Sequence, residues 1–125
     1  MQTIGVDFDG VIHAYTHGWQ NGEIYDEPIF DAFVGLRTLQ WMGYAVFVFT
    51  AREDLAPVAD WITMWSGMET VVDDFLPGDV RRVKFWNDSR RLLVTNRKLP
   101  AAYYVDDRAV HFTTWAATLK EISGE

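Results

Sequence analysis

The chain has 125 residues and a mass of 14.4 kDa, with 49% hydrophobic, 15% aromatic and 23% charged residues. This length fits one domain over residues 1–125, and the composition excludes intrinsic disorder and a collagen-like chain. No apolar run approaches the roughly 20 residues of a membrane-spanning helix, and the first residues do not resemble a secretory signal. Because the chain has no cysteine, disulfides and thiolate sites are excluded, and we expect a cytoplasmic protein.

The formal net charge of −7 argues against a general nucleic-acid-binding protein, but the charge is unevenly distributed. Residues 81–98 hold seven basic residues and one acid, a net charge of +6, whereas the rest holds four basic and seventeen acidic residues, a net −13. This basic block is either a solvated surface or a place where an anion docks. It contains Phe85 and Trp86, so beside a catalytic site it would favour a nucleotide or a nucleic-acid end as substrate.

The first half of the chain predicts two strand–helix units. Residues 3–8 form a short apolar run that ends at Asp-Gly, which is typical of a strand. Residues 13–28 are polar and turn-rich, and we expect a flap there. Pro28 suits a helix start, and the helix should end at Gly43. Residues 44–50 are almost continuously apolar, as in a strand buried on both faces of a parallel sheet.

The second half continues the alternation. Asp54 can cap a helix that has Pro57 in its first turn and ends at Gly67. Residues 68–87 predict a mixture of loop and short helix, and 92–95 a short strand. Residues 102–107 predict a strand that ends in acids, 110–112 an edge strand, and 114–122 a terminal helix. Alternating strands and helices at this spacing predict an α/β, three-layer Rossmann-like fold with a mainly parallel central sheet.

In parallel sheets ligands gather at the carboxyl ends of the strands, and the side chains expected there are unusual. They are Asp7 and Asp9 after the first strand, Thr50 after the second, Lys98 before the last long strand, and Asp106 and Asp107 at its end. Carboxylates that converge at one edge repel one another and require a cation. Hard oxygen ligands without histidine or cysteine suit Mg²⁺, which commonly binds carboxylates together with a substrate phosphate.

This ordered set resembles the four motifs of the haloacid dehalogenase (HAD) superfamily, whose largest class is Mg²⁺-dependent phosphatases. The matching positions are Asp7-Phe8-Asp9-Gly10-Val11, then Thr50, Lys98 and Asp106-Asp107. The resemblance implies that Asp7 is the nucleophile of an aspartyl-phosphate mechanism and that Asp9 is the general acid and base. It also implies that Thr50 and Lys98 hold the phosphoryl group. The implied Mg²⁺ ligands are Asp7, the Asp9 carbonyl and Asp106, with Asp107 a ligand or a partner of a bound water.

The chain departs from most of that superfamily because it has no room for a full cap domain. Only 39 residues separate Gly10 from Thr50, and 47 separate Thr50 from Lys98. We therefore expect a capless phosphatase, a phosphoric monoester hydrolase, with the 13–28 flap as its partial cover. Its partner would be a small phosphorylated substrate such as a nucleotide, and the sequence does not indicate an oligomeric state.

Some side chains near these motifs allow two interpretations. Arg52 either contacts a phosphate or pairs with a surface acid. Trp19, an aromatic residue in a polar flap, is a candidate substrate contact. His13 and His17 have the spacing of metal ligands on a helix, but the turn residues around them argue against a helix.

Two other functions compete with a phosphatase. A phospho-acceptor signalling domain also groups Asp, Thr and Lys around Mg²⁺, but there the acidic pair comes first and the lysine last, whereas here Asp106-Asp107 follow Lys98. The residue Asp9 also favours a hydrolase, since a stable phospho-acceptor does not need a general acid. An inactive metal-binding relative that serves as an interaction module is the third possibility.

Overall fold

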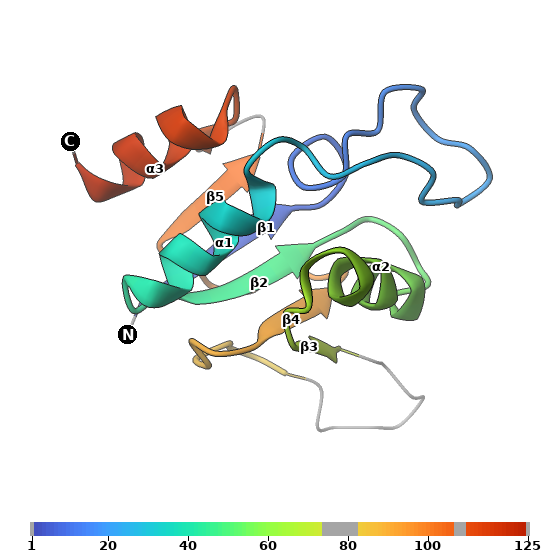
Figure 1. The fold of residues 1–125 in the computed structure, drawn as a ribbon. Coiled ribbons are helices and arrows are strands. Elements are labelled where there is room, and N and C mark those ends of the chain that lie inside the picture. Colours follow the sequence, from blue (N-terminus) through green and yellow to red (C-terminus); the bar gives the residue numbers. More distant parts are fainter. Residues whose placement is uncertain (1, 74–82, 107–109, 125) are drawn as a thin grey trace.

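The chain folds around a parallel β-sheet (Figure 1). A computed structural model describes residues 2–73, 83–106 and 110–124. In these residues the sheet has the strand order β3-β4-β2-β1-β5-β6, and every neighbouring pair is parallel. The strands are β1 (Thr3–Asp7), β2 (Ala45–Phe49), β3 (Thr70–Val72), β4 (Leu92–Thr95), β5 (Tyr103–Asp106) and β6 (Val110–His111). The predicted Rossmann-like α/β fold with a parallel sheet is confirmed.

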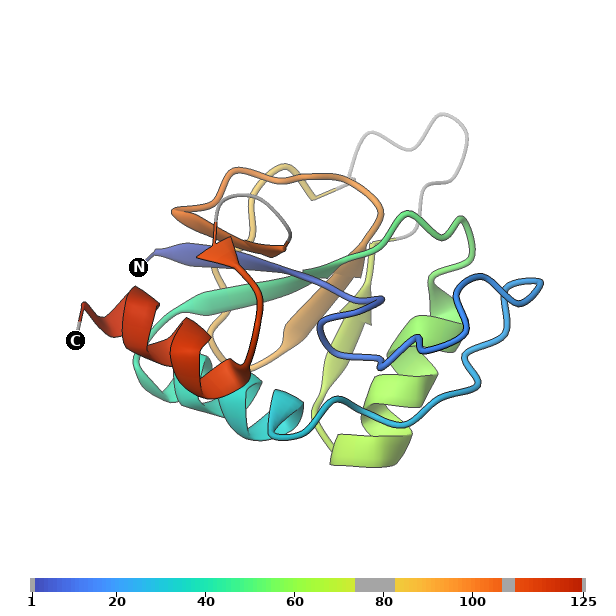
Figure 2. The same ribbon diagram turned by 90° about the horizontal axis from the view of Figure 1, so that it is seen from above.

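The helices of the described residues cover one face of this sheet (Figure 2). They are α1 (Ala32–Trp41), α2 (Ala56–Ser66) and α3 (Trp115–Ser123). Leu36 and Leu39 of α1 and Ile62 of α2 are fully buried in the same cluster as Val46 and Val48 of β2. Because alternate residues of a strand point to opposite faces, the other residues of β2 must be covered from the far side.

The far face of the sheet is covered by the irregular segments 83–91 and 96–102 (Figure 2). Trp86 and Leu99 from these segments pack with Phe47 of β2 in a second buried cluster. A Cβ atom at Gly5 of β1 would lie 2.6 Å from the Phe47 ring and 2.9 Å from the Tyr104 ring, so the lack of a side chain there lets two aromatic rings cross the strand. These segments form the third layer among the described residues.

Most strands and helices lie where the sequence predicts them, but the starts of α1 and α2 differ. The prediction that α1 starts at Pro28 is wrong, because Pro28 forms a β-bridge with His13 and the helix begins at Ala32. The predicted cap at Asp54 is also wrong, since Leu55 holds the N-cap position without a side-chain hydrogen bond. The predicted helix end at Gly67 is confirmed.

The segment 68–87 differs from its prediction as far as it is described. Residues 70–72 form the edge strand β3 and pair with β4, where we expected loop and short helix. Residues 74–82 lie outside the described residues. A three-residue strand at a sheet edge has too little hydrophobic periodicity to be separated from a loop by sequence pattern.

The segment 13–28 leaves the sheet as a long loop, drawn in blue to light blue in Figure 1. Its base is closed by the hydrogen bond from the Ala14 amide to the Glu27 carbonyl, and by the bridge between His13 and Pro28. We call this segment the flap. Between β1 and β2 the described chain forms only the flap, its short connections and α1. No helix in the described parts of the chain has both the length and the apolarity to cross a membrane.

Candidate functional site

Three of the predicted site residues lie at the carboxyl ends of adjacent central strands. Asp7 ends β1, Asp106 ends β5, and Thr50 directly follows β2. Since β1 lies between β2 and β5 in the sheet, the three residues share one edge. Ligands of parallel α/β folds bind at this kind of edge.

Asp7 belongs to a row of side chains that crosses three strands. Its register partner on β2 is Phe49, and Asp106 on β5 is level with it because the preceding residues, Val6 and Val105, are partners. Side chains that are level on neighbouring parallel strands point to the same face, and such strands lie about 4.8 Å apart. The side chains of Asp7 and Asp106 therefore leave adjacent strands on the face covered by segments 83–91 and 96–102.

Lys98 extends over this row. Its Nζ lies 3.5 Å from Oδ2 of Asp106. The same atom lies 5.5 Å from the centre of the Phe49 ring and 5.4 Å from the centre of the Tyr104 ring, distances at which an ammonium group is attracted to an aromatic face. Asp7 stands in the row between Phe49 and Asp106. The charge of Lys98 is therefore held beside Asp106 and between the Phe49 and Tyr104 rings of β2 and β5. The role of Lys98 in binding a phosphoryl group stays a prediction.

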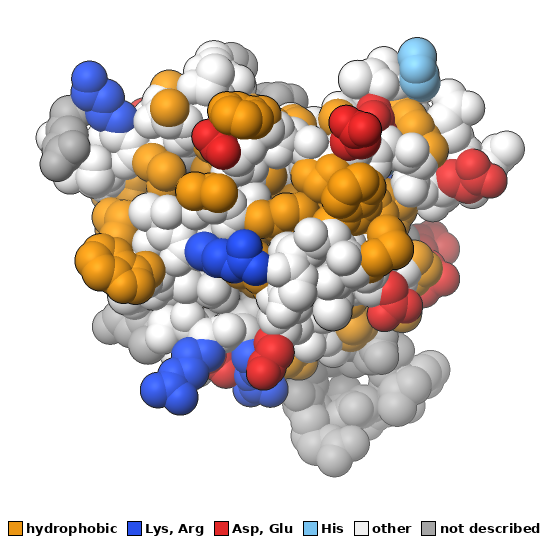
Figure 3. All heavy atoms as spheres, in the orientation of Figure 1, with side chains coloured by type: hydrophobic (Ala, Val, Ile, Leu, Met, Phe, Trp, Pro, Cys, Tyr) orange, Lys and Arg blue, Asp and Glu red, His pale blue; other side chains and the backbone are white. Residues whose placement is uncertain are grey.

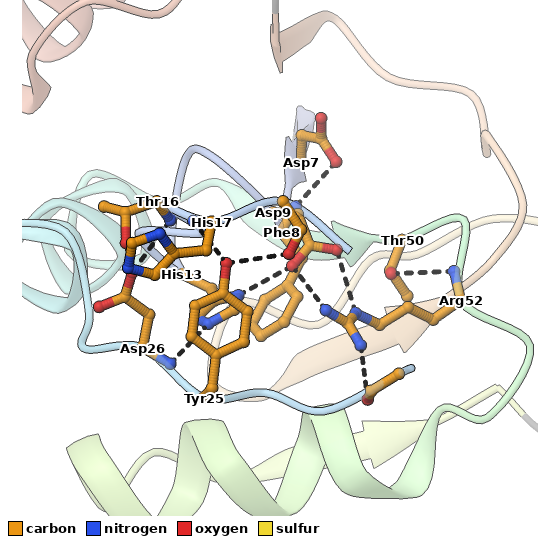
Figure 4. Close-up of polar contacts among 12 residues, drawn as sticks. Asp7, Phe8, Asp9, His13, Thr16, His17, Tyr25, Asp26, Thr50 and Arg52 are labelled. Carbon is orange, nitrogen blue, oxygen red and sulfur yellow. Dashed lines mark hydrogen bonds and ion pairs between the residues drawn. The ribbon is translucent and has the colours of Figure 1, made fainter. Parts of the chain in front are cut away.

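Asp9 points away from Asp7 and pairs with Arg52 (Figure 4). Nε of Arg52 lies 3.0 Å from Oδ2 of Asp9, and the Arg52 Nη2 lies 3.0 Å from Oδ1, so the contact is bidentate. Both side chains are largely shielded from solvent, with Arg52 6% and Asp9 21% exposed. A bidentate guanidinium–carboxylate pair of this kind fixes the orientation of both groups.

His13 makes the third contact to Asp9, and its tautomer follows from its partners. Its Nε2 lies 3.0 Å from the backbone nitrogen of Asp26, which can only donate, so Nε2 accepts and carries no proton. The proton of a neutral imidazole is then on Nδ1, which lies 2.9 Å from Oδ1 of Asp9 and donates to it. His13 is fully buried and stacks on Phe8. The imidazole therefore connects Asp9 to the backbone of the flap.

Asp26, whose backbone amide donates to His13, accepts hydrogen bonds within the flap through its side chain. The Thr16 hydroxyl donates to Oδ2 of Asp26 at 2.5 Å, and the amides of Thr16 and Glu27 also donate to this carboxylate. These hydrogen bonds, led by that of the Thr16 hydroxyl, lower the pKa of Asp26 from 3.8 to about 2. The tip of the flap is held by Tyr25, whose hydroxyl donates to the Gly18 carbonyl.

Arg52 and Thr50 are fixed by the same loop. The Arg52 amide donates to the Thr50 hydroxyl oxygen at 3.1 Å, and Thr50 is buried. The Arg52 guanidinium uses three directions, two toward Asp9 and one toward the Gly22 carbonyl at 2.8 Å. In the structure Arg52 forms an ion pair with an acid, which is one of the two alternatives that the sequence allows. The acid is Asp9, at the sheet edge, and not a surface residue. A phosphate contact of Arg52 stays a prediction that would require it to exchange partners.

The residues at the sheet edge fit a magnesium ion by their chemistry. Asp7 and Asp106 supply carboxylate oxygens from the ends of two adjacent strands, and such hard donors are the ones that Mg²⁺ takes. Asp107 lies outside the described residues. In the described ranges no group of three His, Cys, Asp or Glu side chains is close enough to form a complete metal cage. Mg²⁺ does not need one, because it usually keeps several waters.

The described part of the basic block, residues 83–98, does not form one surface beside this edge. The Thr3 hydroxyl, at the start of β1, donates to the Trp86 carbonyl at 2.7 Å, which places Trp86 near the amino ends of the strands. Trp86 is also buried in the second core cluster. The prediction that Trp86 offers its ring to a substrate at the catalytic edge is therefore wrong.

The described basic side chains of the block are partly paired. Arg91 bonds to Asp88 at 2.8 Å, and Arg97 bonds to the buried Asp73 at 2.6 Å. Arg81 and Arg82 lie outside the described residues. Of the described block, only Lys98 has a place in the candidate site at the carboxyl ends of the strands.

Sequence reasoning missed the partners of Asp9. His13 follows Asp9 by four residues, but His13 drew attention only for its spacing from His17, which is that of metal ligands on a helix. Arg52 is 43 positions away from Asp9. The only signal for their pairing is that both residues follow adjacent parallel strands, β1 and β2, by two or three positions.

No protein-family model matches this chain, and no curated protein matches it. Among solved structures, a conserved protein encoded by a locus of Bacteroides thetaiotaomicron is similar, with a TM-score of 0.64 and 24% sequence identity. The match covers 98% of this chain and 90% of that one. At this level of identity the similarity establishes the α/β fold alone.

Proposed function

We propose that this chain is a Mg²⁺-dependent phosphomonoesterase that forms an aspartyl-phosphate on Asp7. The observation that carries the proposal is the row at the sheet edge, in which Asp7 of β1 stands level with Asp106 of β5 and the Lys98 ammonium group contacts Asp106 and the Phe49 ring of β2. The order of the four motifs, which resembles the HAD superfamily, supports the same assignment. A nucleophilic carboxylate beside a fixed cation is what attack on a phosphate dianion requires.

Two displacements would complete the reaction. First, a carboxylate oxygen of Asp7 attacks phosphorus while the bond from phosphorus to the ester oxygen breaks, and the leaving oxygen takes a proton from Asp9. Water then attacks the same phosphorus, Asp9 takes a proton from this water, and the bond from phosphorus to Asp7 breaks. Inorganic phosphate leaves, and both carboxyl groups return to their starting state.

Lys98 and Thr50 would bind the phosphoryl oxygens from opposite sides of Asp7, since β5 and β2 flank β1. When bound, Mg²⁺ would be held by Asp7 and Asp106, with the Asp9 carbonyl implied by the resemblance, and would stabilise negative charge on the phosphoryl oxygens. Both Asp9 oxygens accept hydrogen bonds from Arg52 in the described geometry. Before it can act as the acid, one Asp9 oxygen must therefore release its Arg52 donor and take a proton from water, and this proton then passes to the leaving oxygen of the ester.

The test is a screen of aryl and alkyl phosphate monoesters with Mg²⁺ and with a chelator, on the wild type and on Asp7→Asn. We expect Mg²⁺-dependent release of phosphate from the wild type and no release from Asp7→Asn. The metal-free variant should melt no lower than the wild type, because the substitution removes one of two adjacent carboxylates. Wild-type protein that becomes phosphorylated without releasing phosphate would instead identify a phospho-acceptor domain.

A further inference from the structure

A cavity of about 510 Å³ lies beside Arg52, the residue whose guanidinium group pairs with Asp9. It is enclosed by the flap, by the loop that follows β2, and by the first turn of α2. Its described lining consists of Trp19, Asn21, Gly22, Ile24, residues 51–54 and Pro57. This volume falls within the range of small-molecule sites. Since Arg52 both lines the cavity and holds Asp9, the cavity adjoins the group assigned to the leaving oxygen.

Trp19 gives this cavity an aromatic wall. Its side chain is 59% exposed, so it contributes little to the core. The centre of its ring lies 5.1 Å from the Arg52 guanidinium carbon, and this contact holds the indole at the mouth of the cavity. A large, partly exposed indole that is fixed in place is suited to stack against another flat ring.

The charge of the lining selects against further anions. Among the described lining residues Arg52 alone is positively charged, and its charge is opposed by Asp9. Glu53 and Asp54 are exposed on the same wall. Figure 3 shows acidic side chains gathered over the flap and the adjoining part of α2, while the visible Lys and Arg side chains lie elsewhere on that face. A second phosphate group in the cavity would be repelled, whereas hydroxyl and amino groups would find acceptors.

We propose that this cavity binds the alcohol part of the substrate and that Trp19 selects a flat aromatic group without a second phosphate. A nucleoside monophosphate has this chemistry, and a sugar phosphate or a nucleic-acid end does not. The assignment of the cavity to a substrate rests on the proposed phosphatase function. The selection of a flat, non-anionic ring by Trp19 is a binding property, which can be measured without turnover.

The experiment measures binding and hydrolysis with the same variants. Adenosine, which has no phosphate, is titrated against the wild type, Trp19→Ala and Trp19→Phe, with ligand-detected NMR as the readout. Trp41→Ala is the matched control, because Trp41 is 89% exposed on α1, away from the cavity lining. We expect binding by the wild type and the control, weaker binding by Trp19→Phe, and loss of at least about fivefold in affinity for Trp19→Ala, as for one stacked base.

For hydrolysis, the KM of adenosine 5′-monophosphate should rise at least about fivefold in Trp19→Ala, while the KM of ethyl phosphate stays unchanged. Adenosine 3′,5′-bisphosphate should bind the wild type more weakly than the monophosphate, and a Glu53→Gln, Asp54→Asn double variant should narrow that difference. Absence of adenosine binding, or equal changes for the adenosine and ethyl esters, would overturn the cavity assignment. Adenosine binding without hydrolysis of any ester would overturn the phosphatase proposal and leave the ring-binding site intact.

Discussion

At the scale of single residues, the orientation of Asp9 is set by two donors of different kinds. Arg52 contributes a charged, bidentate contact from the loop after β2, and His13 contributes a neutral Nδ1–H from the base of the flap. His13 can donate to Asp9 only while its Nε2 accepts from the Asp26 amide. Protonation of Nε2 would place two donors face to face, so the observed geometry belongs to the neutral imidazole.

This arrangement predicts different effects for two substitutions of His13. Asn can place an amide near the Nδ1 position and keep the donor to Asp9, whereas Gln reaches the Nε2 position and keeps only the acceptor for the flap. We expect kcat for an alkyl phosphate to fall roughly 10- to 100-fold in His13→Gln and clearly less in His13→Asn, because misplacing the acid slows proton transfer. Activated aryl esters, which need no proton, should change little in either variant.

Nitrogen NMR of the imidazole gives an independent check on the same residue. The wild type should show Nδ1 protonated and Nε2 unprotonated near neutral pH. If the opposite tautomer is found, or if both variants lose activity equally on alkyl and aryl esters, His13 is only a packing residue. Melting curves of both variants would separate an unfolded protein from a misplaced Asp9.

At the scale of elements, the close packing of α1 against α3 depends on the absence of a side chain at Gly35. A Cβ atom there would overlap the indole of Trp115. That indole cannot easily move, because it is buried and its Nε1 donates to the Val11 carbonyl at 3.1 Å. Gly35 therefore sets the distance between the two helices. The Trp115 indole connects them to the segment that follows β1.

We expect Gly35→Ala to destabilise the fold even though alanine favours a helix. Overpacking of a core typically costs about 1–3 kcal/mol, and the overlap of the new Cβ with the Trp115 ring favours the upper half of that range. Since glycine-to-alanine in a helix gains about 1 kcal/mol, a net loss of about 1–2 kcal/mol should remain. Urea unfolding measures this change. Val34→Ala, next to it on the exposed side of α1, is the control and should unfold at nearly the wild-type midpoint. A stability gain in Gly35→Ala would show that the indole can shift.

The flap should respond to acid through Asp26. Its pKa is lowered from 3.8 to about 2 by hydrogen bonds from Thr16 and Glu27, so the stabilisation is fully present above about pH 4. It is lost as the pH falls through about 2. The Thr16 amide resonance should therefore titrate with a midpoint near 2, and this transition should be absent in Asp26→Asn. A midpoint near 3.8 in the wild type would mean that the hydrogen bonds do not persist in solution.

At the scale of the whole molecule, the sequence predicts the sheet edge better than the loops beside it. Apolar runs that end in Asp7, Thr50 and Asp106 specify buried parallel strands, and parallel strands necessarily bring their carboxyl ends to one side. Nothing comparable specifies the path of a loop. The basic block precedes Lys98 in sequence, yet Trp86 lies at the opposite end of the strands, since the chain from Trp86 to Lys98 runs the length of β4.

The contacts of Asp9 were also beyond sequence reasoning for a physical reason. The Arg52 side chain reaches Asp9 only because the loop after β2 bends back over the edge, where the Arg52 amide donates to the Thr50 hydroxyl. Likewise, α1 starts at Ala32 and not at Pro28 because the Ile29 amide donates to the Ile12 carbonyl and holds that segment extended. Both outcomes depend on contacts between distant backbone groups, which local propensity does not contain.

The proposed metal site can be tested on the stability of the whole chain. An ion that binds only the folded state stabilises it by RT ln(1 + [L]/Kd), so Mg²⁺ at about 100 times its Kd should add about 2.7 kcal/mol. In a domain of this size that gain raises the melting temperature by several degrees.

We expect this shift in the wild type and in Asp60→Ala, which removes an exposed carboxylate on α2, and not in Asp106→Ala. Because Asp106 stands level with Asp7 and beside Lys98, loss of its carboxylate should weaken the binding of Mg²⁺ without disturbing the strands. A shift of equal size in Asp106→Ala would place the ion elsewhere, and the absence of any shift in the wild type would remove magnesium from the proposed reaction.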